Sequence, residues 1–284
     1  KMSSKLNSLG LVKQSVDQWL NQVNYGDDLT YKPSAFALAF VNFIKLVNGG
    51  SGEENTTPVL HLKMLDQIDR LDTPKIANMV FRGAAKTTVL GEYLLLYLAV
   101  FGQLPTFGKI NLAIYVSDSV ENGVKNMRKN LEYRRENSSF LMKAIPHAKF
   151  TDIRWEFNNA SGNRFIVKGY GGQTGVRGVK EMGVRPQLAI IDDVVSDEDA
   201  RSQTCIDKIK DTVHNAIDHA MHPMGSKTIW SGTPFNASDP LYEAIESGSW
   251  AVNCYPVCEK FPCTEEEFKG AWENRFTYAH IRRK

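Results

Sequence analysis

Two separated sets of polar residues in this sequence have the types and spacing for phosphate chemistry. The first is Lys86-Thr87-Thr88, which follows an apolar run and the small-residue turn Arg82-Gly83-Ala84-Ala85. The second is Asp192-Asp193, which ends another apolar run about a hundred residues later. A lysine supplies a point charge for terminal phosphates, and a threonine hydroxyl is a ligand for magnesium. Of two adjacent carboxylates, one can hold the magnesium water shell while the other polarises the attacking water.

The first set lies where a strand is expected to turn into a helix. Residues 76–81 are typical of a buried strand, and residues 89–101 of a core helix. At such a junction, free backbone N–H groups and the helix N-terminus point at one spot and favour an anion. Residues 82–88 therefore predict a phosphate loop in which Lys86 faces the terminal phosphates and Thr87 faces the metal.

This loop departs from the general pattern G-x-x-x-x-G-K-[ST]. Val80 and Ala85 occupy the two glycine positions, and Gly83 stands between them. Because alanine tolerates fewer backbone conformations than glycine, we expect the loop to turn without a left-handed residue at position 85. The motif by itself leaves an ordinary strand–helix connection open as the alternative.

Strand and helix patterns alternate through the rest of the chain. Apolar runs predict strands at 110–116, 188–191 and 227–230 and a hairpin over 153–167, while helical periodicity covers 120–131, 201–221 and 240–247. The fold is predicted to be α/β, with a doubly wound, mainly parallel sheet. Since such sheets collect ligands at the carboxyl ends of their strands, the phosphate loop and Asp192-Asp193 support each other.

Three further stretches are open to a functional or a purely structural interpretation. Gln67, on a helix expected over 60–71, either hydrogen-bonds an adenine edge or faces solvent. The glycine-rich loop 168–178, which carries Arg177, suggests a backbone that approaches something closely or moves. Ser231-Gly232-Thr233 ends a strand and either senses the nucleotide state or only turns the chain.

Composition bounds the class of protein without identifying a partner. The chain has 284 residues, 42% hydrophobic and 23% charged, which is typical of a globular protein of one large domain or a core with an appendage. A formal charge of +2 gives no argument for nucleic acid from bulk charge. The chain begins without an apolar leader, and helix 89–101 is too short to cross a bilayer and carries Glu92. We therefore expect a cytosolic protein without a membrane partner.

Two local clusters are ambiguous at this stage. Cys254, Cys258 and Cys263 have no fourth ligand nearby, which favours buried thiols over a zinc site. Helix 120–131 and its continuation carry a basic face that is either a DNA contact or a solvated surface, formed by Lys125, Arg128, Lys129, Arg134 and Arg135.

Taken in order, the motifs resemble the ATPase domain of the large terminase subunit, the DNA-packaging motor of tailed phages. The matching pieces span roughly residues 60–240 and are 81–87, 175–178, 185–186, 188–193 and 231–234. The resemblance implies a P-loop (ASCE-type) core that binds ATP and Mg2+ and drives double-stranded DNA into a procapsid. Phosphate loops of this family often lack the first glycine, carry an arginine at the place of Arg82 and have alanine before the lysine.

The resemblance also implies roles for individual residues. Lys86, Arg82, Asp193 and Arg177 would be catalytic, with Arg177 acting on the ATP of an adjacent subunit. Nucleotide binding would fall to Gln67 and the loop residues Arg82, Gly83, Ala84, Ala85, Lys86, Thr87 and Thr88, metal binding to Thr87 and Asp192, and coupling to Ser231, Gly232 and Thr233. The family commonly ends the acidic strand Asp-Glu, so that the shorter Asp193 leaves Asp197 or Glu198 as alternatives for activating water.

Expected partners and boundaries follow from the same resemblance. The partners would be double-stranded DNA, the portal protein, the small terminase subunit and further copies in a ring, expected to be a pentamer, in the host cytoplasm. The expected division is a helical N-terminal segment (1–57), the ATPase core (58–262) and the start of a linker toward an absent nuclease domain (263–284), since 272–276 resemble that junction. The alternatives are a helicase-type DNA-dependent ATPase and a non-catalytic nucleotide-binding regulatory module.

Overall fold

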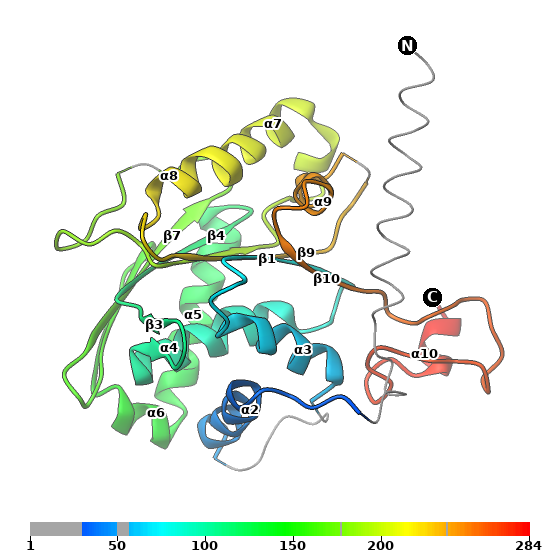
Figure 1. The fold of residues 1–284 in the computed structure, drawn as a ribbon, viewed down its shortest axis with the longest axis horizontal. Helices are drawn as coiled ribbons and strands as arrows, with labels where there is room; N and C mark the ends of the chain where they lie inside the picture. The colour runs from blue at the N-terminus through cyan, green and yellow to red at the C-terminus, as the bar shows by residue number, and fades with distance from the viewer. Residues whose placement is uncertain (1–29, 50–56, 177, 237) are drawn as a thin grey trace.

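An eight-stranded sheet separates two layers of helices in the computed structural model (Figure 1), which describes residues 30–49, 57–176, 178–236 and 238–284. The strands from β10 to β7 are parallel to their neighbours, and β6 is antiparallel to both β7 and β5. In order across the sheet they are β10 (Ala251–Tyr255), β1 (Lys75–Val80), β9 (Lys227–Gly232), β8 (Leu188–Asp192), β4 (Leu112–Ser117), β7 (Arg164–Gly171), β6 (Arg154–Asn158) and β5 (His147–Phe150). A separate two-stranded sheet pairs β2 (Gln103–Leu104) with β3 (Gly108–Lys109).

Helices cover both faces of the large sheet (Figure 1). On one face lie α2 (Ala35–Val47), α3 (Val59–Ile68), η1 (Thr87–Tyr93) continuing into α4 (Leu94–Phe101), η2 (Val120–Val124) continuing into α5 (Lys125–Glu136), and α6 (Ser139–Ala144). On the other lie α7 (Gln203–Asp211), η4 (Thr212–Ile217), α8 (Asp218–Ala220) and α9 (Pro240–Glu246), with the short turn η3 (Asp199–Arg201) before α7. Helix α10 (Tyr278–Arg282) lies beyond the β10 edge. The expected doubly wound, mainly parallel α/β fold is confirmed.

The strand order decides which loops meet. Strand β9 lies between β1, which leads into the phosphate loop, and β8, which ends in the acidic pair. Because the three strands are parallel, their carboxyl ends share one edge of the sheet. This arrangement is consistent with the expected P-loop core.

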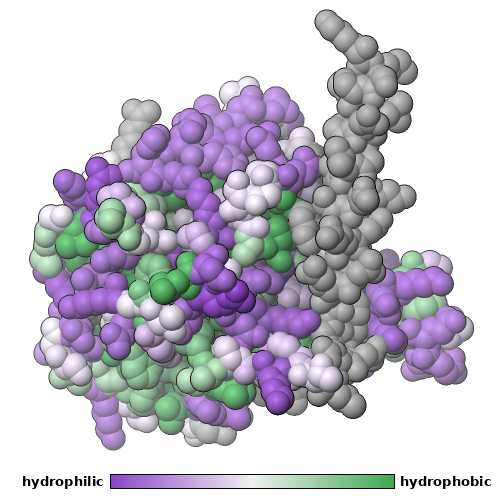
Figure 2. Space-filling view, in the orientation of Figure 1, coloured by the Kyte–Doolittle hydropathy of each residue, from purple (hydrophilic) through white to green (hydrophobic). Residues whose placement is uncertain are grey.

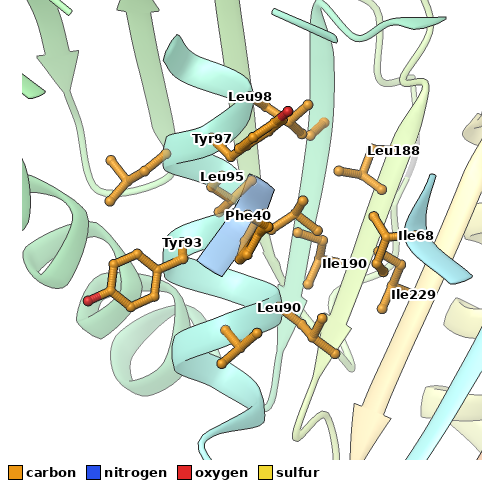
Figure 3. Packing of buried hydrophobic residues seen from close by; sticks show 14 of the residues in the cluster. Phe40, Ile68, Leu90, Tyr93, Leu95, Tyr97, Leu98, Leu188, Ile190 and Ile229 are labelled. Carbon is orange, nitrogen blue, oxygen red and sulfur yellow. The ribbon is translucent and has the colours of Figure 1, made fainter. Parts of the chain in front are cut away.

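The helix that follows the phosphate loop is the centre of one core layer (Figure 3). Its residues are apolar all round, which is typical of a buried helix, and Tyr97 and Leu98 pack in the same cluster as Ile190 and Ile229 of the sheet. Tyr97 also contacts Phe40 of α2, with ring centroids 5.4 Å apart. This packing anchors the helix, and therefore the loop that precedes it, against the sheet.

Local signals placed most element ends within a few residues. Helix α2 begins after Ser34, whose side chain accepts a hydrogen bond from the Ala37 N–H, as an N-cap should. The helix expected from residue 120 begins there, after Ser119, whose hydroxyl accepts a hydrogen bond from the Asn122 N–H. Residues 1–29 of the helical segment expected over 1–57 lie outside the described residues.

The basic face of α5 is largely used by the fold itself, although either reading was open from the sequence. Lys129 is the only one of the five without a hydrogen-bond or ion-pair partner among the described residues. The other four are held as follows: Lys125 by Glu121 and Asp152, Arg128 by Glu132, Arg134 by Glu92, and Arg135 by the carbonyl groups of Ile145 and Pro146. Charges already paired have less to offer a DNA phosphate, which favours a solvated structural face.

Hydrophilic residues dominate the face shown in Figure 2, and the apolar groups on it are scattered. Among the described residues, the helices are all too short or too polar to span a membrane. Cys254 and Cys258 are buried and Cys263 is half-buried.

Candidate nucleotide-binding site

A pocket of about 540 Å³ opens at the carboxyl edge of the sheet, where β1, β9 and β8 end. Five of the residues expected from the sequence line it, namely Arg82, Thr87, Asp192, Asp193 and Thr233. These residues come from three segments far apart in the chain. The fold therefore brings together the phosphate loop, the acidic pair and the coupling segment.

The phosphate loop turns through left-handed backbone at two positions. Gly83 has a φ of 87°, and Ala85 has a φ of 59°. The expectation that position 85 would avoid a left-handed conformation is therefore wrong. Such a conformation costs a non-glycine residue about 1–2 kcal/mol, and it persists where surrounding contacts impose it.

Hydrogen bonds on either side of Ala85 impose this conformation. The Val89 N–H donates to the Ala85 carbonyl at 2.9 Å, which starts the following helix. His61 of α3 lies 2.7 Å from the Ala84 carbonyl through Nε2. Burial lowers the pKa of His61 to about 4, so the ring is neutral at pH 7, and since the partner is a carbonyl, Nε2 carries the donated proton.

Changing Ala85 to glycine is expected to stabilise the protein. Glycine removes the left-handed strain but loses more entropy on folding, which leaves a net gain of roughly 0.5–1 kcal/mol, or about 2 °C in Tm. Gly83→Ala should lower the Tm, because a Cβ there would lie 2.9 Å from Cζ of Phe276 on a backbone with positive φ. Thermal unfolding measures both, and a lower Tm for Ala85→Gly would show that the loop is not strained at this position.

Lys86 is buried and already in contact with the other two segments. Its Nζ lies 3.2 Å from Asp193 Oδ2 and donates a hydrogen bond of 3.2 Å to Thr233 Oγ1. The Thr233 hydroxyl in turn donates to the carbonyl of Val80, at the end of β1, at 2.7 Å. Lys86 therefore links the loop to the segments that follow β8 and β9, although it does not itself line the pocket.

The two acidic residues have different environments. Asp192 is fully buried, and burial together with the charge of Asp193 raises its pKa to about 6. Thr87 and Lys86 act in the opposite direction, because both stabilise the charged carboxylate. The Tyr115 hydroxyl donates to Oδ2 of Asp192 at 2.9 Å. Oδ1 is buried and accepts no hydrogen bond of good geometry from the described residues, although the Thr87 hydroxyl lies near the carboxyl group. Buried polar atoms normally have a partner, and a bound ion would supply one for this carboxylate oxygen.

The donor set around Asp192 fits magnesium. Carboxylate and hydroxyl oxygens are hard ligands, and magnesium is usually held by one or two protein groups, with water and substrate phosphates completing its shell. Thr87 and Asp192 form such a pair. Among the described residues, no cluster of three or more His, Cys, Asp and Glu side chains is placed to hold a metal.

Asp193 is half exposed and faces the pocket. Its backbone has a φ of 42°, and its N–H donates to the Ser231 carbonyl at 3.0 Å, which ties the residue to β9. Of the two alternative acids, Asp197 lines the same pocket and Glu198 does not. Geometry therefore keeps Asp193 and Asp197 as candidates for orienting water.

Asp192→Asn is expected to raise the stability of the protein without nucleotide, and the gain should depend on pH. The folded pKa lies above the ordinary value, so stability is lost as pH rises from about 4 to about 6. Removing the buried charge should therefore stabilise the fold at pH 8 by up to about 3 kcal/mol, and by less at pH 5. Thermal unfolding at both pH values, with Asp118→Asn as the control, checks this. A gain independent of pH would contradict it.

Of three further expected residues, one contacts a side chain away from the pocket, one lines the pocket from an exposed position, and one is not described. Gln67 does not line the pocket, because its amide exchanges two hydrogen bonds with the side chain of Asn253, at 2.9 and 3.3 Å. Arg82 is exposed, with its guanidinium 5.6 Å from the centre of the Phe235 ring. Arg177 lies outside the described residues.

A row of hydrogen-bonded polar side chains behind the coupling segment, formed by Asn78, Ser231 and Asn253, was not predicted from the sequence. Asn78 of β1 is fully buried and donates to Ser231 Oγ at 3.2 Å, and it accepts from Asn253 of β10 at 2.7 Å. Tyr115 beneath Asp192 was also missed. An asparagine inside an apolar strand was the available signal for the row, since a buried amide needs partners. The row fixes Ser231 relative to the phosphate-loop strand.

Comparisons with known proteins identify the fold. The sequence matches no family model and no curated protein. The HK97 bacteriophage large terminase is similar in structure, with a TM-score of 0.51, 15% identity, and coverage of 81% of this chain and 46% of that one. The large terminase ATPase domain of a Thermus phage aligns with a TM-score of 0.49, 12% identity, and coverage of 75% of this chain and 74% of that one.

Identities this low show the fold alone, and the chain spans less than half the length of the HK97 protein. The resemblance expected from the motifs is confirmed at that level: in fold, this chain is similar to a phage large terminase.

Proposed function

We propose that this chain is a magnesium-dependent ATPase motor domain that drives double-stranded viral DNA into a procapsid. The observation that carries the proposal is the meeting of Lys86, Asp193 and Thr233 above the buried Asp192. Burying a lysine costs free energy, and an ordinary strand–helix connection does not require a buried lysine beside a carboxylate from another loop. The fold similarity to a phage large terminase supports the choice of motor over other ATPases.

In the proposed mechanism, ATP binds with its phosphates on the loop. Backbone N–H groups of residues 83–88 hold the phosphate oxygens, and Lys86 moves from Asp193 to the terminal phosphate. Thr87 and Asp192 would hold magnesium, which would supply positive charge to the phosphates. Asp193, released from Lys86, accepts a hydrogen bond from the attacking water and orients it. Arg82 adds a positive charge from the same subunit.

The coupling segment senses the result through Lys86. Thr233 contacts Lys86 before the nucleotide binds, so any movement of the lysine changes this contact. Ser231 and Gly232 continue this segment into β9, which crosses the core. We propose the remaining partners by analogy with large terminases: a portal protein, a small terminase subunit and a ring of further copies, in the host cytoplasm.

The test is ATP hydrolysis by the purified chain with and without magnesium, blunt double-stranded DNA and an empty procapsid bearing its portal. We expect hydrolysis to require magnesium and to rise when DNA and the portal are both present. Binding of ATP without turnover would favour a regulatory module instead. Absence of any nucleotide binding would contradict the proposal.

Arg177 is expected to act on the ATP of a neighbouring copy. An arginine supplied in this way raises phosphoryl transfer by roughly a thousandfold or more. Inactive Arg177→Ala mixed with inactive Lys86→Ala should therefore recover part of the activity under assembling conditions, since some interfaces regain one intact site and one intact arginine. Arg82→Ala mixed with Lys86→Ala is the control and should not recover. If neither mixture recovers, Arg177 does not act between subunits.

A further inference from the structure

A second pocket, of about 170 Å³, touches the phosphate loop through different residues from the first. Thr87 lines the larger pocket, whereas Ala85 and Thr88 line the smaller one. A ligand whose phosphates lie along the loop can therefore reach both pockets. The larger pocket, which Asp192 and Asp193 line, suits the end that carries metal and terminal phosphate.

The smaller pocket is built from different chemistry. Its walls include the aliphatic side chains of Val41, Ile44 and Leu65, together with the indole of Trp272. Trp272 is 92% buried, at 8% exposure, and meets the His61 ring edge-on with centroids 4.9 Å apart. Polar groups complete the lining, among them Thr57, Tyr93 and Arg134. A pocket with aliphatic and aromatic walls and a few polar groups suits a flat ring that carries hydrogen-bonding atoms.

Arg275 lines this pocket and is exposed to water. Its guanidinium lies 5.1 Å from the centre of the Trp272 ring and 5.8 Å from that of Phe276, and it lines the pocket. In the described part of the chain, no carboxylate pairs with it. A planar cation stacked on aromatic rings can cover another ring or meet a phosphate oxygen.

The segment that carries these residues packs directly on the phosphate loop. Phe276 meets Phe81 edge-on, with centroids 5.1 Å apart, and its ring lies close enough to Gly83 that no Cβ would fit there without a shift. Residues 272–276 thus form part of the wall around the loop. Their expected place in a linker does not account for this contact.

We propose that the smaller pocket binds the nucleoside of the nucleotide, with the base against Trp272 and Arg275 beside the phosphate nearest the sugar. This inference rests on the proposed ATPase function and names the part of the site that recognises the nucleoside. A cavity of about 150 Å³ admits benzene, so a pocket of about 170 Å³ has room for the flat ring of the base, with the sugar outside it. Gln67, the residue expected to read adenine, lines neither pocket and is bonded to Asn253.

The experiment compares ATP with inorganic tripolyphosphate, which has the phosphates without a nucleoside. Both are measured by equilibrium binding with magnesium, on the wild-type chain and on Arg275→Ala, Trp272→Leu and Lys86→Ala. Loss of a base-stacking group weakens binding by roughly fivefold to a hundredfold. We expect that loss for ATP in Arg275→Ala and Trp272→Leu, with tripolyphosphate affinity nearly unchanged. Lys86→Ala should weaken both ligands.

Matched controls separate the pocket from general damage. Trp250→Phe changes an equally buried tryptophan that packs on Trp230 and lines neither pocket, and Arg282→Ala changes a nearby exposed arginine. Both should bind ATP as the wild type does. Arg275→Ala alone keeps the test valid if Trp272→Leu does not fold, because Arg275 is exposed.

The outcomes distinguish this inference from the function on which it rests. If the wild-type chain binds neither ligand, the proposed function fails. If it binds both, and Arg275→Ala leaves ATP affinity unchanged or weakens both ligands equally, the nucleoside is not held in this pocket. Selective loss of ATP affinity supports the assignment.

Discussion

Lys86→Ala is expected to lower ATP turnover by roughly a hundredfold to a thousandfold or more, the range found when one preorganised donor to developing charge is removed. The side chain is 95% buried, at 5% exposure, and its Nζ is already placed between Asp193 and Thr233. Among the described residues, no lysine lines either pocket at the loop, and Lys86 reaches the larger one through its contacts with Asp193 and Thr233, which do line it. Alanine removes the ammonium group that is proposed to move to the terminal phosphate, and steady-state hydrolysis with magnesium measures the loss.

The same variant should keep its fold. The ion pair that it removes involves a half-exposed carboxylate, and pairs with such access to water contribute about 0–1 kcal/mol. The Tm without nucleotide should move by no more than a few degrees. Lys129→Ala, an exposed lysine on α5 without a partner among the described residues, is the control and should match the wild type. Turnover at the wild-type rate in Lys86→Ala would show that the phosphate-loop assignment is wrong.

Asp193→Asn is expected to bind ATP with magnesium and to hydrolyse it roughly a hundredfold to ten-thousandfold more slowly. The amide keeps the shape of the side chain but loses the basic oxygen that orients water. Asp192→Asn should instead weaken the magnesium-dependent part of nucleotide binding, because it changes the buried carboxylate beside Thr87. Single-turnover hydrolysis and equilibrium binding together separate the two effects.

Asp197 and Glu198 provide the matched comparison for Asp193. Asp197 lines the same pocket and is exposed, whereas Glu198 lines neither. If Asp193 orients the water, Asp197→Asn and Glu198→Gln should both hydrolyse ATP at close to the wild-type rate. If Asp193→Asn remains active while one of these loses activity, the water is oriented by that other acid.

The last part of the chain contacts the phosphate loop through Phe276. The division into an N-terminal segment (1–57), a core (58–262) and a linker (263–284) stays a prediction. Residues 272–276 nevertheless pack on the phosphate loop through Phe81 and Gly83. A displacement of this segment would therefore change the packing of the phosphate loop.

The sequence by itself determined the alternation of strands and helices and the identity of the site-forming segments. Buried strands such as 188–191 and the helix after the phosphate loop are visible as apolar runs because burial on all sides demands apolar residues. Lys86-Thr87 and Asp192-Asp193 were found because each follows such a run. These signals are local, and they depend on no knowledge of which strands are neighbours.

Only the tertiary structure decided what those segments touch. The placement of β9 between β1 and β8 brings Thr233 to Lys86, and no periodicity encodes strand order. The conformation of Ala85 was predicted wrongly because it is imposed by His61 and the following helix rather than by its own preference. Gln67, for which the sequence left an adenine contact and a solvent-facing position open, is hydrogen-bonded to Asn253. Partners contributed by distant segments fix how each of these residues is used, and such long-range contacts exist only once the chain has folded.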